Sequence, residues 1–197
     1  MKTSLILLSS ILLLAACKKE EQIVPKATTN QQVTTTTVAT TPVVAAIPDT
    51  AMVRIRLANT ADATQYDETL FIFNHASTLA YGSNDAAYFQ GFGQVSLSGV
   101  TSDNRNVSIY GLPYTAGMSV PLNVNTKADG SYSLGISYES KIPSGTHVWV
   151  KDAYLKDSVD VCKGNYSFNV AKADTNSFGS KRFKLVFTVQ AQVSAPH

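Results

Sequence analysis

The 197-residue sequence is poor in several residue types, and each scarcity narrows the class of protein. It has 2 cysteines and 3 histidines, too few and too widely spaced for a disulfide framework or a metal-binding motif. The 16 basic and 14 acidic residues leave a net charge of +2, without the basic stripe that binds nucleic acid. Phosphate-binding glycine loops and hydrolase motifs are also missing. We therefore expect no catalytic residues, no metal, no cofactor and no nucleic-acid partner.

Long apolar runs are equally scarce, and the one that stands out lies at the N-terminus. After Lys2, the residues from Leu5 to Leu14 are apolar except for two serines. This run is about half of the roughly 20 residues that a membrane-spanning helix requires. It ends in Leu14-Ala15-Ala16-Cys17, which resembles the cleavage site of bacterial lipoproteins. We predict that residues 1–16 are a signal peptide and that Cys17 carries acyl chains such as palmitate, which anchor the protein to a membrane. The alternative is an ordinary secretory signal with an unmodified Cys17.

The residues after Cys17 indicate where the anchored protein resides. Lys18-Lys19-Glu20-Glu21 resembles the export signal of surface-exposed lipoproteins in the Bacteroidetes, which predicts an outer-membrane protein facing the cell exterior. The alternative is a charged spacer. Residues 17–50 are otherwise rich in threonine and lack aromatic residues, a composition typical of a disordered linker. Asp49-Thr50-Ala51 resembles a Bacteroidetes O-glycosylation motif, so Thr50 is a candidate glycosylation site.

From residue 51 onward, apolar and polar residues alternate with a period of two, which indicates half-buried strands. No segment of this part shows helical spacing. We predict an all-β domain over residues 51–190, an antiparallel β-sandwich of the jelly-roll or immunoglobulin-like type with about 8–10 strands. A flexible tail, 191–197, is expected to follow. Gly164-Asn165 predicts a tight hairpin. The expected core comprises Val53, Ile55, Phe71, Phe73, Ile109, Leu122, Leu134, Ile136, Val148, Phe168, Phe183, Leu185 and Phe187.

A series of short motifs in this domain is similar to a known family. The motifs occur in the family's order: Tyr66-Asp67-Glu68-Thr69, Ala76-Ser77-Thr78, Ser108-Ile109-Tyr110-Gly111-Leu112-Pro113, Gly130-Ser131-Tyr132-Ser133-Leu134, Val148-Trp149-Val150-Lys151-Asp152 and Arg182-Phe183-Lys184-Leu185-Val186-Phe187. They resemble the β-domain that precedes the type IX sorting domain in secreted, adhesin-like proteins of the Bacteroidetes. The resemblance implies a sandwich domain with an adhesive role and provides no catalytic residues.

Aromatic residues in loops rich in glycine, asparagine and serine are the best candidates for a binding site. Their rings could stack on sugars while neighbouring amides and carboxylates bind the hydroxyl groups. The alternative is that the rings fill the ends of the core. We expect a non-catalytic binding or adhesion domain whose ligand is a glycan or a surface protein. A structural or accessory subunit of an outer-membrane assembly is the alternative function. The candidate ligand-binding residues are Tyr81, Asn84, Asp85, Tyr88, Phe92 and Tyr114.

Overall fold

A computed structural model of the chain describes residues 47–189. The predicted signal peptide, Cys17, the linker up to residue 46 and the tail from residue 190 lie outside the described residues. The last residues of the predicted linker belong to the folded unit. Ile47 packs in the hydrophobic core, and the backbone N–H of Thr50 donates to the carbonyl of Phe73 at 2.8 Å. The folded part therefore includes residue 47, ahead of the predicted boundary at residue 51.

Strands dominate the described residues, with one 3-10 turn, η1 (Thr175–Ser177), as the exception. The absence of α-helices from residues 47–189 confirms the all-β prediction. The strands are β1 (Met52–Asn59), β2 (Tyr66–Phe73), β3 (Ala86–Ala87), β4 (Val95–Val100), β5 (Asn106–Leu112), β6 (Ser119–Thr126), β7 (Gly130–Ser140), β8 (Thr146–Asp152), β9 (Asp157–Asp160), β10 (Tyr166–Val170) and β11 (Gly179–Val189).

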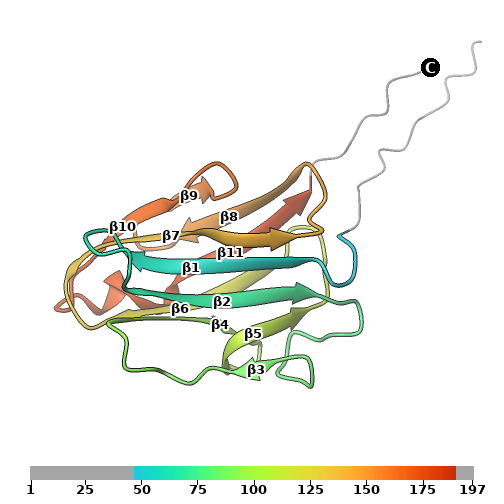
Figure 1. Cartoon of the computed structure of the whole chain (residues 1–197), viewed down its shortest axis with the longest axis horizontal. Helices are drawn as coiled ribbons and strands as arrows, with labels where there is room; N and C mark the ends of the chain where they lie inside the picture. The colour runs from blue at the N-terminus through green and yellow to red at the C-terminus, as the bar shows by residue number, and fades with distance from the viewer. Residues whose placement is uncertain (1–46, 190–197) are drawn as a thin grey trace, which may run out of the picture. The chain divides into compact units, whose positions relative to one another are not determined.

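Hydrogen bonds join these strands into a single 11-stranded sheet rather than two separate ones (Figure 1). The order is β10-β7-β1-β2-β5-β4-β6-β11-β8-β9, with β3 paired to β5. All pairs are antiparallel except β2 with β5, which is parallel. The sheet curls toward a barrel, and β9 and β10, at the two ends of the order, are joined by the short turn 161–165. A sandwich of two separate antiparallel sheets is not confirmed.

The alternation of β1 is the clearest case in which sequence pattern and structure agree. Val53, Ile55 and Leu57 are fully buried, while Arg54 and Arg56 alternate with them on the outer face. Side chains on successive residues of a strand point to opposite faces, so this pattern assigns one face to the core. The same face continues across the sheet into the buried residues of β2, β7 and β11.

Two residues of the expected core, Ile109 and Ile136, are only partly buried. In β5 the buried residues are Val107, Tyr110 and Leu112, so the alternation changes register within the strand. In β7 the pairing with β1 shifts between Arg54 and Ile55, which leaves Ile136 at an irregular position. A one-residue shift turns a side chain to the other face, and period-two counting cannot detect it.

The predicted hairpin at Gly164-Asn165 is wrong. These residues connect β9 to β10, but β9 pairs with β8 and β10 pairs with β7. The turn crosses from one end of the strand order to the other, and Asn165 lies over Gly135 of β7. A Cβ added to Gly135 would sit 1.9 Å from the side-chain oxygen of Asn165, so any other residue at position 135 would force the Asn165 side chain to move.

Candidate functional site

Five connections gather at the end of the sheet opposite to Ile47 and Val189 (Figure 1). We call this region the loop end; it consists of residues 60–65, 88–94, 127–129, 153–156 and 171–178. Hydrogen bonds link neighbouring loops. The backbone N–H of Lys127 donates to the carbonyl of Gln94 at 2.8 Å, and that of Lys172 donates to the Asp129 carboxylate at 2.5 Å. Strands of about eight residues separate the loop end from the opposite end by about 25 Å.

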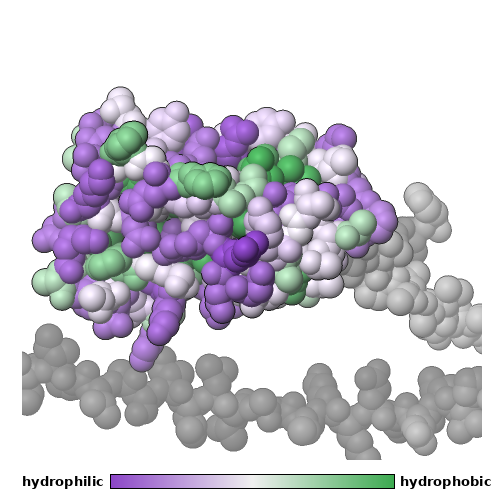
Figure 2. Space-filling view, turned by 90° about the horizontal axis from the view of Figure 1, so that it is seen from below, coloured by the Kyte–Doolittle hydropathy of each residue, from purple (hydrophilic) through white to green (hydrophobic). Residues whose placement is uncertain are grey.

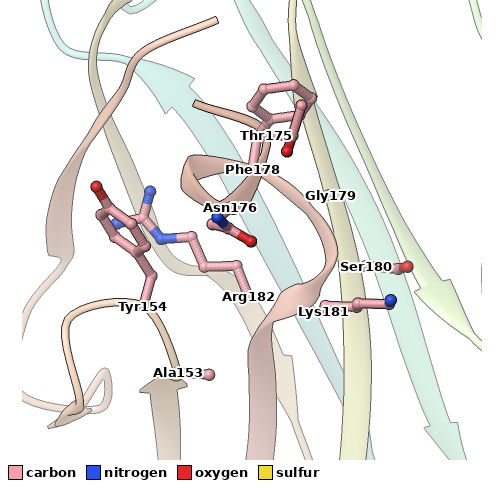
Figure 3. Close-up of a pocket in the computed structure, with 9 residues that line it drawn as sticks. All are labelled: Ala153, Tyr154, Thr175, Asn176, Phe178, Gly179, Ser180, Lys181 and Arg182. Atoms are coloured by element: carbon pink, nitrogen blue, oxygen red, sulfur yellow. The ribbon is translucent and has the colours of Figure 1, made fainter. Parts of the chain in front are cut away.

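A pocket of about 480 Å³ opens at the loop end (Figure 3). The turn after β8, the 3-10 turn η1 and the start of β11 form its walls. Two aromatic rings, Tyr154 and Phe178, lie beside the amide of Asn176 and the amine of Lys181. Pockets that bind small molecules combine such apolar walls with a few polar groups. The full lining comprises Ala153, Tyr154, Thr175, Asn176, Phe178, Gly179, Ser180, Lys181 and Arg182.

A buried ion pair fixes the inner wall of this pocket. The side chains of Arg182 and Asp152 are 1% and 0% exposed, and the closest guanidinium nitrogen lies 2.7 Å from the carboxylate. The hydroxyl of Tyr166 donates to the same carboxylate at 2.9 Å. Arg182 also donates to the backbone carbonyls of Asn169, at 2.8 Å, and of Ser177. Burial raises the pKa of Asp152, but the hydrogen bonds from Arg182 and its neighbours outweigh burial and hold that pKa below its ordinary value of 3.8.

Tyr154 is held in place at the mouth of the pocket. Its ring centroid lies 5.0 Å from the guanidinium carbon of Arg182, and its hydroxyl donates to Asp174 at 2.8 Å. The hydrogen bond with Asp174 raises the pKa of Tyr154. The backbone N–H of Asn176 also donates to Asp174, at 2.9 Å, and lowers the pKa of that carboxyl. Tyr154 remains 44% exposed, so part of its ring is available to a ligand.

Phe178 forms the second aromatic wall of the pocket. It is partly buried against the hydrophobic core, and the amine of Lys172 lies 3.8 Å from its ring centroid. The cation therefore covers part of the ring from the side of the 171–178 loop. The view of the pocket shows Asn176 between Phe178 and Arg182 (Figure 3). Rings, amide and amine together could pack against and hydrogen-bond a polar ring-shaped ligand.

Three of the predicted ligand-binding residues, Tyr81, Asn84 and Asp85, lie away from the loop end. Asn84 and Asp85 line a smaller recess of about 120 Å³ beside Gly111. The amide of Asn84 donates to Ser77 at 3.0 Å, and Asp85 accepts the backbone N–H of Gly111 at 2.8 Å. Tyr81 packs against the core. These polar groups bind one another and shape the loop between β2 and β3.

The remaining three predicted residues lie in different surroundings, although Tyr88 and Phe92 belong to the same loop, 88–94. Tyr88 donates to the Asp67 carboxylate at 2.7 Å, and burial together with Asp67 raises the pKa of Tyr88 to about 12. Tyr114 packs edge-on against Phe73 at a centroid distance of 5.8 Å, as the alternative of core-filling rings predicts. Phe92 projects from the loop end and is fully exposed. The structure therefore does not unite the six predicted residues in one site.

The pocket residues Tyr154, Asn176 and Phe178 were not predicted from the sequence. They are distributed over residues 153–182 and come together only because β8 pairs with β11. The only local sequence feature that could have indicated the pocket is the 3-10 turn, in which the Asp174 side chain accepts a hydrogen bond from the backbone N–H of Asn176. An aspartate two residues before an asparagine is common in turns, and it does not by itself indicate a pocket.

Two of the three neighbouring acidic residues Asp152, Asp157 and Asp160 are buried. Asp152 is buried against Arg182, and Asp160 is buried 2.8 Å from the ring of His147. Asp157 is exposed. Within residues 47–189 no group of three or more histidine, cysteine or acidic side chains is arranged to hold a metal ion.

The candidate glycosylation residue and the second cysteine of the chain are both exposed. Thr50 is exposed, and its hydroxyl accepts a hydrogen bond from Lys141 at 2.9 Å. Cys162 is a free, exposed thiol. In the described part of the chain, no helix has the length and apolar character needed to cross a membrane. The chain has no match among known protein families, curated proteins or solved structures.

Proposed function

We propose that this chain is a lipoprotein, anchored through Cys17 to the outer membrane and displayed at the cell surface, whose β-domain binds or adheres to a glycan without catalysis. The cleavage-site motif and the charged residues after Cys17 support the anchoring. The pocket at the loop end supports the binding role. This pocket lies at the end of the domain opposite to Ile47, where the chain from the anchor enters.

The observation that carries the glycan proposal is the chemistry of the pocket. Its volume of about 480 Å³ suits a small ligand. The apolar faces of a sugar ring pack on aromatic rings such as Tyr154 and Phe178. Sugar hydroxyls accept and donate hydrogen bonds, which the amide of Asn176 and the amine of Lys181 could complement. The Arg182–Asp152 pair is fully occupied with internal partners and serves to hold the wall in place.

In this proposal the domain is a β-sandwich whose two layers are joined to each other by hydrogen bonds along their edges. Rings on non-neighbouring strands support the two-layer arrangement: Phe187 of β11 lies 6.2 Å from Phe71 and 5.1 Å from Phe73, both on β2. β2 and β11 are not adjacent in the sheet, so these contacts cross the interior. An experimental structure that showed one closed barrel of paired strands would contradict the two-layer arrangement.

A glycan array tests the binding role, with the purified full-length protein and two matched variants. Asn176→Ala removes an amide from the pocket and leaves the backbone N–H that caps the 3-10 turn. We expect a roughly 5- to 150-fold loss of affinity for the bound glycan, since one lost hydrogen bond to a ligand is worth about 1–3 kcal/mol. Asn84→Ala, in the loop between β2 and β3, is the control and should bind as the wild type does.

Three outcomes would contradict this proposal. If only Asn84→Ala weakened binding, the site would be the recess beside Gly111. If no glycan bound and the protein co-purified with a defined set of outer-membrane proteins, the alternative of an accessory subunit would replace the binding role. If palmitate did not label Cys17, the anchoring would be wrong, whatever the array showed.

A further inference from the structure

Large apolar side chains that remain exposed concentrate at the loop end. Of the seven in the described residues, Phe89, Phe92, Tyr154 and Leu155 lie in its loops, and Tyr66 directly follows one of them. The entry end of the domain, around Ile47, has no comparable group among the described residues. Such a distribution is unusual for a surface that contacts only water.

Phe89 and Phe92 are the most exposed of these side chains, at 87% and 101%. They lie in the loop 88–94, Tyr-Phe-Gln-Gly-Phe-Gly-Gln, which contains no charged residue. Both rings project outward and cover no core residue. Viewed from the β3 side, the surface is mostly hydrophilic and its apolar residues form small separate groups (Figure 2). We call the loop 88–94, with its two exposed rings, the apolar tip; it does not belong to a broad apolar face.

A lysine lies beside this apolar tip. The amine of Lys127 donates to the carbonyl of Phe92 at 3.0 Å, so one cation lies directly beside the loop. No salt bridge among residues 47–189 involves the lysines of the loop end or of the strand that follows it. The carboxylates of the loop end instead accept hydrogen bonds from backbone N–H groups, as Asp129 does from Lys172 of the neighbouring loop and Asp174 does from Asn176. These lysines are Lys127, Lys156, Lys172 and Lys181.

We propose that Phe89 and Phe92 insert into the interface of the lipid bilayer that carries the Cys17 anchor, with Lys127 at the headgroups. A protein-binding surface is typically enriched in aromatic residues, phenylalanine included, but depleted in lysine. Projecting aromatic rings edged by lysine are instead typical of segments that lie in a membrane interface. A fluid bilayer also accommodates a convex tip without a matching pocket.

The chain between anchor and domain is long enough for this contact. Residues 17–46 span at most about 100 Å, several times the length of a strand of the domain. The loop end can therefore reach the bilayer although Ile47 enters at the opposite end. The contact would turn the pocket beside Tyr154 toward the membrane surface, where glycolipid headgroups and surface polysaccharides are found. This inference rests on the lipid anchoring in the proposed function.

The test uses the full-length lipidated protein reconstituted in phosphatidylcholine vesicles that contain phosphatidylglycerol and lipids brominated on the acyl chains. Phe92→Trp places a fluorescent reporter at the tip, and Leu79→Trp places one at another exposed position, 46% exposed, away from the loop end. The wild type gives the background from its one tryptophan, Trp149. We expect blue-shifted emission and bromine quenching for Trp at position 92, and neither for Trp at position 79.

A second variant tests the contribution of the neighbouring ring. Adding Phe89→Ala to Phe92→Trp should lower the ratio of inserted to free loop about tenfold, because one buried aromatic ring is removed. Equal acrylamide quenching of the position-92 reporter with and without vesicles would overturn the proposal. A blue shift that required added outer-membrane proteins would also overturn it and assign the loop to a protein partner. Failure of the wild type to associate with vesicles would instead contradict the anchoring at Cys17.

Discussion

The buried ion pair between Asp152 and Arg182 gives the sharpest prediction for stability. The carboxylate accepts hydrogen bonds from two guanidinium nitrogens at 2.7–3.1 Å and from Tyr166 at 2.9 Å, with no exposure to solvent. Asp152→Asn keeps the shape but leaves the Arg182 charge buried without its counterion. Removal of one partner of a buried pair costs about 3–5 kcal/mol.

That cost is a large part of the roughly 5–15 kcal/mol by which a domain is stable. For a domain of this size, 1 kcal/mol corresponds to a Tm change of about 3–4 °C, so Asp152→Asn should lower the Tm by about 10–20 °C. Thermal unfolding of the full-length protein, followed by circular dichroism, measures this. Asp157→Asn changes an exposed carboxylate on the neighbouring strand β9 and should alter the stability by about 0.5 kcal/mol or less.

The same pair predicts a pH dependence. The pKa of Asp152 is lower in the folded protein than its ordinary value of 3.8, so the ionised form favours folding. Its contribution is complete above that value and is lost as the pH falls through the folded pKa. The Tm difference between wild type and Asp152→Asn should therefore shrink below about pH 4. A difference that grew with acid, or a cost under 1 kcal/mol at neutral pH, would refute the reasoning.

Three further predictions concern the core and the cysteines. Phe183→Ala should lower the free energy of unfolding by about 3–5 kcal/mol, because Phe183 is fully buried and its ring centroid lies 4.6 Å from that of Phe168. Chemical denaturation measures this loss, and a value below about 1 kcal/mol would contradict the packing. Cys17→Ala should abolish the incorporation of radiolabelled palmitate, and equal labelling would contradict the anchor. Cys162 is exposed and should react with a maleimide in the folded protein. The reaction rate should rise up to and beyond pH 9, because partial desolvation of the sulfur and the nearby Asp160 raise the pKa of the thiol from 9.0. Reducing agent should leave the Tm unchanged, and a thiol inert to maleimide would contradict this assignment.

The strand pattern could be predicted from the sequence because burial alternates locally. Val53, Ile55 and Leu57 are adjacent positions on one face, and their pattern depends on no other part of the chain. Pairing depends on distant residues and was not recoverable in this way. The parallel contact of β2 with β5 and the register shift opposite Ile136 each depend on where another strand lies.

The candidate site shows the same limit more strongly. Phe92 was selected from the sequence because it lies in a glycine-rich loop, and it is exposed. Tyr114 was selected by the same reasoning, yet it packs against Phe73. Exposure of a loop aromatic depends on whether the core has room for it, and this is a property of the packed molecule. Tyr154 and Phe178 form a pocket only after β8 and β11 pair.

The glycan pocket and the membrane-inserting loop share one end of the domain, but they depend on different side chains. Asn176 lies in the pocket and makes no contribution to the apolar tip, whereas Phe92 projects from a loop that does not line the pocket. Asn176→Ala should therefore weaken glycan binding and leave the fluorescence of a position-92 tryptophan in vesicles unchanged. Phe89→Ala should reduce the insertion reported by the position-92 tryptophan and leave the affinity for a soluble glycan unchanged. If either change affected both measurements by similar factors, the loop end would act as one site, and a ligand that combines sugar and lipid would explain the data better than two separate contacts.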